Sequence, residues 1–392
     1  MPNLLALLEE MPNASEFYAD YWNRRPFVVR GGVSQDSMAG LITANELAGL
    51  AMEDAPLSRM VKTEGDQHGW SCRFGPFSEL DFETAGDTDW SLLIQNVEQF
   101  HPGTSSLLRH FNFSPRWLMD DIMVSFSTPG GSVGPHLDSY HVFLVQGRGK
   151  RRWKVSQRPI EEEVYIEGLE MKVLASDFDG DEVEVSTGDV LYIPPRFGHQ
   201  GTTTETSLTF SVGFLGPKLS ELMNGYAQYL ADAEDTDRRY VGDNLDSASG
   251  GFNISRDASD NIRSHLQSLL ISEEFNQWLV EFFTASSHDN FGNYDQRDAP
   301  LNINEFSNSL DQGTGLTKPE YVKFAITASP SGEFFLGFDC HSFTLNESMF
   351  PLVQILMKEQ VVSGESYPQL FDHPATVELL LELYNHQALE FI

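Results

Sequence analysis

Cysteine is nearly absent from this chain. Only Cys72 and Cys340 occur among its 392 residues, and they lie far apart with no CxxC pair. Two distant cysteines exclude a disulfide framework and a cysteine-rich zinc site. Such usage is typical of proteins in a reducing compartment, so we expect a cytoplasmic protein.

Long apolar runs are missing as well. No stretch reaches the roughly 18 consecutive apolar residues of a membrane span, so no membrane association is expected. The short apolar run at the N-terminus contains Glu9 and Glu10 and follows no basic region. This pattern argues against a secretory signal peptide.

Basic residues are few. The chain has 25 Lys and Arg residues against 58 Asp and Glu residues, which gives a net charge of −33. Nucleic-acid binding requires clustered basic side chains, so no direct binding of nucleic acid is expected. So acidic a chain attracts basic proteins over long distances, or its charge only maintains solubility; composition leaves both open.

Residues 120–214 carry the strongest strand signal. Short runs alternate apolar and polar residues between glycine- and proline-containing turns, and no helical period intervenes. This pattern predicts an antiparallel barrel or jelly roll. Within it we expect an extended strand through 136–144, a turn at 146–149, a turn at Gly188-Asp189 and a last strand ending near Gly216.

The flanking regions have other periods. Before the barrel we expect a strand at 27–30, a helix capped by Thr43 and Glu46, and helical structure at 90–100. After Lys218, apolar residues recur at helical spacing, and these helices pack on the barrel or on a second subunit. The last hundred residues combine helices with a hairpin, as in a winged helix. Residues 291–392 hold 4 basic and 14 acidic residues, which argues against DNA binding there.

Three residues of the barrel region form a candidate metal site. His136 and Asp138 are two positions apart, so in an extended strand both side chains point to the same face. His199 lies 199 − 138 = 61 residues further on, which leaves room for hairpins that return it to the pair. Two imidazoles and one carboxylate with open positions are the ligand set of non-haem Fe(II) oxygenases. An inert structural metal site in a barrel is the alternative.

Arg151 is the second chemical signal. Strand parity places it on the same face as Trp153 and Val155, so its guanidinium is expected to point inward. A buried guanidinium needs an anionic partner, because an unpaired buried charge costs roughly 3–5 kcal/mol. The partner is either a bound carboxylate or a structural ion pair. The other histidines examined have no partner at ligand spacing and are expected to be ordinary polar side chains: His101, His110, His141 and His341.

Residues 120–155 and 191–199 together resemble the JmjC-type oxygenases. More narrowly, they resemble the bacterial ribosomal oxygenases that hydroxylate an arginine of the sixteenth large-subunit ribosomal protein. The resemblance continues through the rest of the chain, in the segments 23–32, 46–53, 88–100 and 210–214 and then more faintly to the end. It implies a mainly β catalytic domain, a double-stranded β-helix of the JmjC/cupin-like class, then an α-helical region and a small α+β winged-helix-like domain. The implied boundaries are 1–216 for the oxygenase domain, 217–286 for the helical dimerisation region and 287–392 for the C-terminal domain.

The resemblance also implies roles for single residues. His136, Asp138 and His199 correspond to the catalytic Fe(II) ligands. Arg151 corresponds to the arginine that binds the distal carboxylate of 2-oxoglutarate, in agreement with the parity argument, and Ser125 to a serine beside that cosubstrate. The positions that line the pocket for the substrate arginine correspond to Asp121, Met123, Tyr140 and Ser211. Two departures from the family pattern, Arg196 and Thr209, are expected to lie away from the ligand set.

The function implied is an Fe(II)- and 2-oxoglutarate-dependent protein hydroxylase that uses O2. Its expected substrate is an arginine of a basic large-subunit ribosomal protein, and its expected assembly is a homodimer. Two alternatives remain. One is a histidyl hydroxylase or lysyl demethylase of the same fold, and the other is a non-enzymatic acidic protein that binds basic ribosomal proteins.

Overall fold

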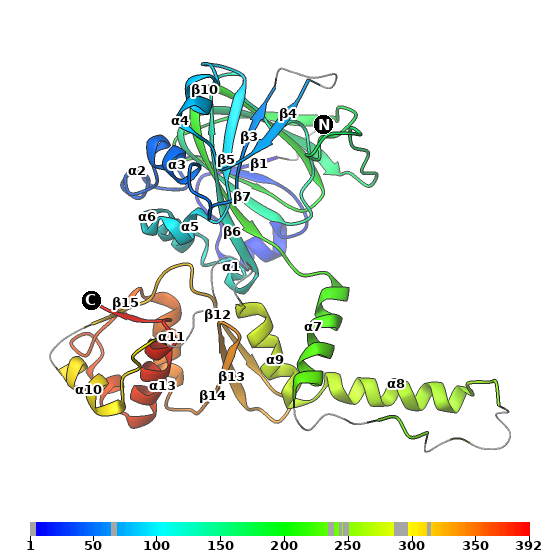
Figure 1. Cartoon of the computed structure of the whole chain (residues 1–392), viewed down its shortest axis with the longest axis vertical. Coiled ribbons are helices and arrows are strands. Elements are labelled where there is room, and N and C mark those ends of the chain that lie inside the picture. Colours follow the sequence, from blue (N-terminus) through cyan, green and yellow to red (C-terminus); the bar gives the residue numbers. More distant parts are fainter. Residues whose placement is uncertain are drawn as a thin grey trace. The chain divides into compact units, whose positions relative to one another are not determined.

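In the computed structural model, the first half of the chain contains two long antiparallel strands, β7 (His141–Pro159) and β10 (Phe197–Phe214), which pair with each other (Figure 1). The structure describes residues 5–63, 69–233, 239–242, 245, 251–285, 297–311 and 315–392. The chain divides into two compact units, Met1–Gly216 and Pro217–Ile392. Among the described residues, no helix combines the length and apolarity needed to cross a membrane.

One large sheet dominates the first unit. Its strands lie in the order β1-β2-β9-β7-β10-β6-β5-β3-β4, and β8 pairs with β7 off this path. All pairs are antiparallel except β1 with β2. The strands are β1 (Ala6–Leu8), β2 (Phe27–Val29), β3 (Ser58–Lys62), β4 (Ser71–Phe74), β5 (Trp90–Ile94), β6 (Met119–Ser127), β7 (His141–Pro159), β8 (Gly180–Ser186), β9 (Val190–Ile193) and β10 (Phe197–Phe214).

Short helices accompany this sheet. They are α1 (Ala14–Glu16), a π-helical turn (Phe17–Tyr21), α2 (Gln35–Ala39), α3 (Ala44–Leu50), α4 (Glu79–Glu83), α5 (Val97–Phe100), α6 (Pro102–Ser105) and two 3₁₀ turns (Ser106–Phe111, Arg116–Leu118). The capping box predicted for α3 is confirmed. The Glu46 amide donates to the Thr43 hydroxyl (3.4 Å), and the Thr43 amide donates to the Glu46 carboxylate (2.8 Å).

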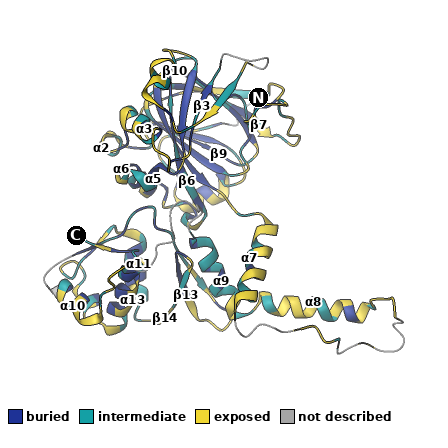
Figure 2. Cartoon of the chain, viewed as in Figure 1, coloured by how far each residue is buried: buried dark blue, intermediate teal, exposed yellow. Residues whose placement is uncertain are grey.

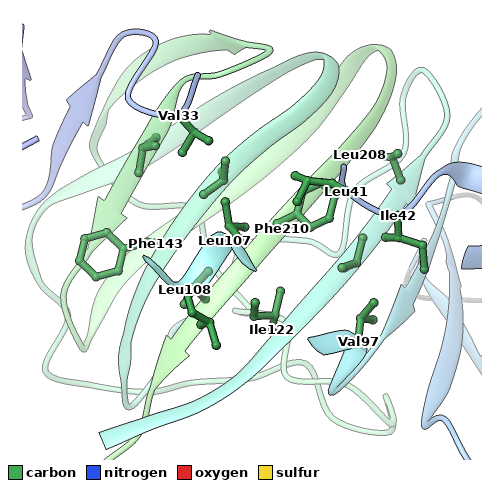
Figure 3. Close-up of a cluster of buried hydrophobic side chains, with 14 of the residues drawn as sticks. Val33, Leu41, Ile42, Val97, Leu107, Leu108, Ile122, Phe143, Leu208 and Phe210 are labelled. Atoms are coloured by element: carbon green, nitrogen blue, oxygen red, sulfur yellow. The ribbon is translucent and has the colours of Figure 1, made fainter. Parts of the chain in front are cut away.

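Strand parity separates two faces of the sheet. Ile122 of β6, Phe143 of β7 and Phe210 of β10 are at most 1% exposed and belong to one hydrophobic core. Figure 3 shows them with Leu107 and Leu108 of a 3₁₀ turn. The opposite face of β7 belongs to another cluster, which includes Val142, Leu144, Trp153 and Val155. The side chains that alternate with the core residues along these strands therefore face the barrel interior.

The predicted turn at 146–149 is wrong. β7 continues through it because β10 pairs with it along nearly its whole length, while its other edge passes from β9 to β8. The strand bends instead of turning, and β10 has register shifts opposite this bend. Gly149 has φ +68°, and a Cβ there would lie 2.1 Å from the Thr206 carbonyl oxygen. Glycine thus permits the close approach of the two bent strands.

The helix expected over 90–100 is also wrong in its first half. Residues Trp90–Ile94 form β5, which pairs with β3 and β6, and only Val97–Phe100 is helical. All five residues of β5 are buried, so the run has no exposed face and no period that distinguishes a strand from a buried helix. The extended strand expected from residue 136 begins only at His141, and the preceding residues form an irregular segment.

The second unit combines helices with two small sheets. α9 packs on β13 closely enough that a Cβ on Gly337 would lie 2.4 Å from the Val280 carbonyl oxygen. The division of this unit at residue 286 stays a prediction, and the residues next to that boundary lie outside the described ones. The elements are α7 (Leu219–Asp232), α8 (Arg256–Leu270), α9 (Glu273–Thr284), α10 (Ile303–Asp311), β11 (Leu316–Thr317), β12 (Phe324–Ala328), β13 (Phe334–Phe338), β14 (His341–Leu345), α11 (Phe350–Lys358), β15 (Val361–Val362), α12 (Pro368–Phe371), α13 (Pro374–Asn385) and β16 (Glu390–Phe391).

Candidate metal centre and cosubstrate pocket

The segment before β7 and the first residues of β10 bring the predicted ligands together. The His136 amide donates to the His199 carbonyl (3.0 Å), and the His199 amide donates to the His136 carbonyl (3.0 Å). This isolated antiparallel bridge lies outside the regular strand pairing. It holds the two histidines side by side, with ring centroids 4.2 Å apart. The distant ligand is thus positioned by the backbone and not only by its side chain.

Backbone carbonyls orient both imidazoles. The Nδ1 atoms of His136 and His199 lie 3.0 Å from the carbonyl oxygens of Gly134 and Phe197. A carbonyl oxygen only accepts, so each Nδ1 carries the hydrogen and each Nε2 keeps its lone pair for a ligand. The His199 Nε2 is 3.3 Å from an Asp138 carboxylate oxygen. One donor atom from each of the three residues lies within 4.8 Å of the others.

The protonation states suit metal binding. Burial, followed by the influence of the neighbouring His199, lowers the pKa of His136 to about 4. Burial acts to raise the pKa of Asp138, but the influence of the neighbouring His199 and His136 outweighs it, so that this pKa is lowered. At neutral pH His136 is therefore neutral and Asp138 ionised, which are the forms that bind a cation.

Arg196, in the turn before His199, contacts the ligand set. Its amide donates to the Asp138 carbonyl (2.8 Å), and its guanidinium donates to the carbonyls of Ile160 (2.7 Å) and Glu161 (2.6 Å). Its φ of +67° is costly for a residue with a side chain. The expectation that Arg196 lies away from the ligand set is wrong. The turn ties Asp138 to the segment that follows β7.

Arg151 points into the barrel and is 3% exposed. Its terminal nitrogens make only long contacts, to the Ser125 hydroxyl (3.4 Å) and the Gly201 carbonyl (3.4 Å). Its Nε and the indole nitrogen of Trp153 are buried without a hydrogen-bond partner. Burial lowers the pKa of Arg151 to about 10, so the side chain remains a cation at neutral pH. No carboxylate among the described residues forms an ion pair with it.

These groups line one cavity in the barrel. Eight of the nine predicted site residues line it: His136, Asp138, His199, Arg151, Ser125, Met123, Tyr140 and Ser211. Asp121, the ninth, is not among its lining residues but lies next to it. A Cβ on Gly213 would be 3.3 Å from an Asp121 oxygen and 3.6 Å from the Tyr140 ring. Burial, then the charges of Asp138 and Asp121, raise the pKa of Tyr140 well above its usual value.

Other lining residues were not predicted. Leu93, Val133 and Thr209 line the cavity, and the Thr209 hydroxyl donates to the Gln146 side-chain oxygen (3.1 Å). Arg59 of β3 also lines it, although no sequence motif marks this residue. A signal was available, because Met60 belongs to the core and its neighbour Arg59 must face the opposite side of the strand.

The residues fit a divalent metal and a dicarboxylate. Two Nε2 atoms and one carboxylate on one side of the site leave further coordination positions, as in the two-histidine, one-carboxylate Fe(II) sites. Arg151 is a fixed guanidinium fork with an unpartnered Nε, beside a serine hydroxyl, and this combination suits a carboxylate. An inert metal site would have no need of such an anchor.

Comparisons with known proteins agree with this geometry. The JmjC domain model matches residues 106–222. The uL16 3-hydroxylase of Escherichia coli is 35% identical over 384 residues, which cover 95% of this chain and 96% of that protein. A probable ribosomal oxygenase of Haemophilus influenzae is 39% identical over 214 residues, which cover 54% of this chain and 52% of the relative.

Solved structures give the same result. The structure of a ribosomal oxygenase from E. coli in complex with cobalt and 2-oxoglutarate matches with a TM-score of 0.80 at 30% identity. The match covers 97% of this chain and 98% of that one. It confirms the predicted fold class: a JmjC cupin-like β domain followed by helices and smaller sheets.

Proposed function

This chain belongs to the family of JmjC-domain ribosomal oxygenases, and we propose that it hydroxylates an arginine of a large-subunit ribosomal protein. It is a 2-oxoglutarate-dependent oxygenase, with Fe(II) as its metal. The relative from E. coli is a uL16 3-hydroxylase, which favours uL16 as the substrate here as well. The acidic chain, with a net charge of −33, suits a basic protein substrate.

One observation carries the proposal. The three ligand atoms of His136, Asp138 and His199 lie within 4.8 Å of one another in the same cavity as a buried arginine. A ligand triad alone suits many barrel proteins, and a buried arginine alone suits an ion pair. Their combination in one cavity suits a metal with a dicarboxylate cosubstrate.

The proposed division of labour follows the contacts. His136, Asp138 and His199 hold Fe(II), which together with 2-oxoglutarate and O2 supplies the oxidant for insertion of oxygen into a C–H bond. Arg151 binds the distal carboxylate of 2-oxoglutarate, assisted by the Ser125 hydroxyl. The carbonyls behind the imidazoles keep both rings in place, and the barrel walls exclude bulk water from the reacting carbon.

The substrate arginine is proposed to bind beside β6 and β10. The Asp121 carboxylate pairs with its guanidinium, and the Ser211 hydroxyl accepts from it. The Tyr140 ring and the Met123 side chain flank its aliphatic stem. Tyr140 stays protonated because its pKa is raised, so it adds no negative charge beside the metal. Contacts to both the guanidinium and the aliphatic stem fix which carbon faces the oxidant.

The decisive experiment uses peptides. Purified protein with Fe(II), 2-oxoglutarate and O2 is incubated with a uL16 peptide that contains the arginine, and with matched peptides that carry histidine or methyllysine instead. Mass spectrometry should show a gain of one oxygen on the arginine peptide alone. Oxygen on histidine, or loss of methyl groups from lysine, would refute the arginine assignment and retain the enzyme class. If no peptide causes consumption of 2-oxoglutarate, the remaining alternative is a non-enzymatic protein that binds basic ribosomal proteins.

The helical region is proposed to form a homodimer. Exposed apolar residues repeat at i and i+4 on α7 and on α8: Leu219 and Met223 are 80% and 59% exposed, and Leu266 and Leu270 are 56% and 40% exposed. Figure 2 shows how much of both helices is exposed. A pair of apolar rows on adjacent elements is typical of a surface that a second copy covers.

Sedimentation tests the dimer. The 44.0 kDa chain should sediment as twice that mass, and Leu266→Glu should shift it to the monomer. Gln267→Glu adds the same charge one position away and should leave the dimer intact. A wild-type monomer would refute the proposal. For localisation, we propose the cytoplasm, where ribosomal proteins are made, and no direct contact with nucleic acid.

A further inference from the structure

Arg59 has no role in the chemistry described so far. It lies on β3, is half-buried, and lines the same cavity as the ligand triad and Arg151. Among the described residues, none forms a hydrogen bond or an ion pair with its side chain. A guanidinium has five N–H donors and no acceptor, so a ligand that enters the cavity is the natural source of acceptors.

The sheet register places Arg59 away from the cosubstrate anchor. Arg59 is paired with Leu93 of β5, and Leu93 is paired with Ser125 of β6. Neighbouring strands are about 4.8 Å apart, so Arg59 stands two strands, on the order of 10 Å, from Ser125. Arg151 contacts Ser125 from β7, on the other side. The two cations therefore occupy different walls of the cavity.

Arg59 is instead close to the metal ligands and to the proposed substrate pocket. It lines the cavity together with His136 and Tyr140. Arg59 thus shares the cavity with a metal ligand and with the aromatic ring proposed to flank the substrate.

The chemistry of the occupants limits what Arg59 can bind. This step rests on the proposed function: Arg151 takes one carboxylate of 2-oxoglutarate and the metal takes the other end. The substrate side chain is a cation and is repelled by Arg59. Every residue of the substrate polypeptide also brings a main-chain carbonyl oxygen, which is an acceptor that neither Arg151 nor the metal occupies.

We propose that Arg59 is a substrate-binding residue that donates hydrogen bonds to main-chain carbonyls of the ribosomal protein segment that enters the cavity. It holds the backbone of the target arginine while Asp121 holds the guanidinium. The two contacts fix both ends of the residue. Because a main-chain contact is independent of sequence, Arg59 provides affinity and register, and Asp121 provides selection for arginine.

The test separates the substrate from the cosubstrate. Arg59→Met should raise the KM for the uL16 peptide at least tenfold, and Arg59→Lys should raise it less. The KM for 2-oxoglutarate should stay within twofold of wild type, because Arg59 does not contact the cosubstrate. Arg73→Met is the matched control, because Arg73 lies on the neighbouring strand β4, is exposed, and pairs with Asp81 outside the cavity. It should change none of these values.

Three results overturn the proposal. A raised KM for 2-oxoglutarate in Arg59→Met would assign Arg59 to the cosubstrate, and an unchanged peptide KM would assign it no ligand. A penalty that disappears when the flanking side chains of the peptide are replaced by alanine would mean that Arg59 binds a side chain. If Arg59→Met does not fold, the Arg59→Lys kinetics decide between the same results. A wild-type protein that consumes 2-oxoglutarate but modifies no peptide refutes the proposed substrate and is distinguishable from all three.

Discussion

The two faces of β6, β7 and β10 are both largely buried but differ in chemistry. On the core face, Phe143 and Phe210 are at most 1% exposed and contact only apolar neighbours in the cluster. On the cavity face, Arg151 is 3% exposed, and its Nε has no partner. Burial is favourable for the first set and costly for the second, because an unpaired buried polar group loses its water without compensation. The cavity face is thus incomplete without its ligands.

Polar groups on the core face are satisfied, which sharpens the contrast. His141 precedes Phe143 by two positions and shares its face. Its ring stacks on Trp22 at 3.4 Å, and its Nδ1 is 2.7 Å from the Tyr192 hydroxyl. Both partners belong to the protein, so this polar group needs no ligand. His141 was expected to be an ordinary polar side chain, and in the structure it is a residue of the core with partners from the protein itself.

The largest effect is expected at the metal. Asp138→Ala removes one of three ligands and should reduce peptide hydroxylation by more than the roughly 10–100-fold typical for loss of an outer-shell partner. Thermal unfolding should show an intact fold, since Asp138 is not part of the hydrophobic cores. Asp36→Ala, at an exposed position of α2, is the control and should retain full activity. Substantial hydroxylation by Asp138→Ala would remove Asp138 from the ligand set.

A substitution on the core face should lower the stability of the protein instead. Phe143→Ala creates a cavity among aromatic rings and should lower the free energy of unfolding by about 3–5 kcal/mol. Denaturant unfolding measures the loss. Phe74→Ala on β4 removes a ring that is 56% exposed and should cost less than about 0.5 kcal/mol. Equal losses for the two variants would contradict the assignment of Phe143 to the core.

Arg151→Met should have the opposite signature. It removes the proposed carboxylate anchor, worth about 1.5–3 kcal/mol, so the KM for 2-oxoglutarate should rise roughly 10- to 150-fold. Without cosubstrate, the variant should be at least as stable as wild type, because a buried charge is replaced by an apolar side chain. Arg152→Met is the matched control, since the neighbouring Arg152 side chain is 57% exposed. An unchanged KM for 2-oxoglutarate would refute the anchor.

The last prediction concerns the pH dependence of stability. Burial lowers the pKa of His141 to about 3, whereas the ordinary value is 6.5. Below pH 6.5 the unfolded chain takes up a proton that the folded protein refuses, so stability falls as the pH falls from 6.5 toward 3. His141→Asn removes this loss, and the variant should gain up to about 1.4 kcal/mol relative to wild type per pH unit in that window. Denaturant unfolding between pH 7 and 4 measures the difference. If the free energies of unfolding of wild type and variant change with pH in parallel, the pKa of His141 does not differ between the folded and unfolded states, and the prediction is wrong.

Much of the site was accessible from the sequence. The parity of an extended chain placed Arg151 and Trp153 on one face, and both line the cavity. The same rule placed Met123 and Ser125 on one face of their strand, whereas Ser211 came from the resemblance alone; all three line the cavity. The spacing of His136 and Asp138 predicted a shared face even though the strand begins only at His141, because an extended irregular segment keeps the same alternation.

The failures share a physical cause. The sequence of β5 is apolar throughout, so it carries no period, and only its pairing with β3 and β6 makes it a strand. Glycines at 147 and 149 are typical of a turn, but β10 supplies backbone partners on both sides of them and keeps β7 continuous. Arg59 was missed because its neighbours carry no recognisable motif.

The sequence by itself determined which residues can do chemistry and which face of each strand they occupy, because alternation and donor chemistry are local properties. The tertiary structure decided which of these residues contact one another. The bridge between His136 and His199, the contact of Arg196 with Asp138, and the position of Arg59 across the cavity from Arg151 depend on pairing between strands distant in the chain. Such pairing is set by the summed burial and hydrogen bonding of the whole sheet, which no single segment encodes.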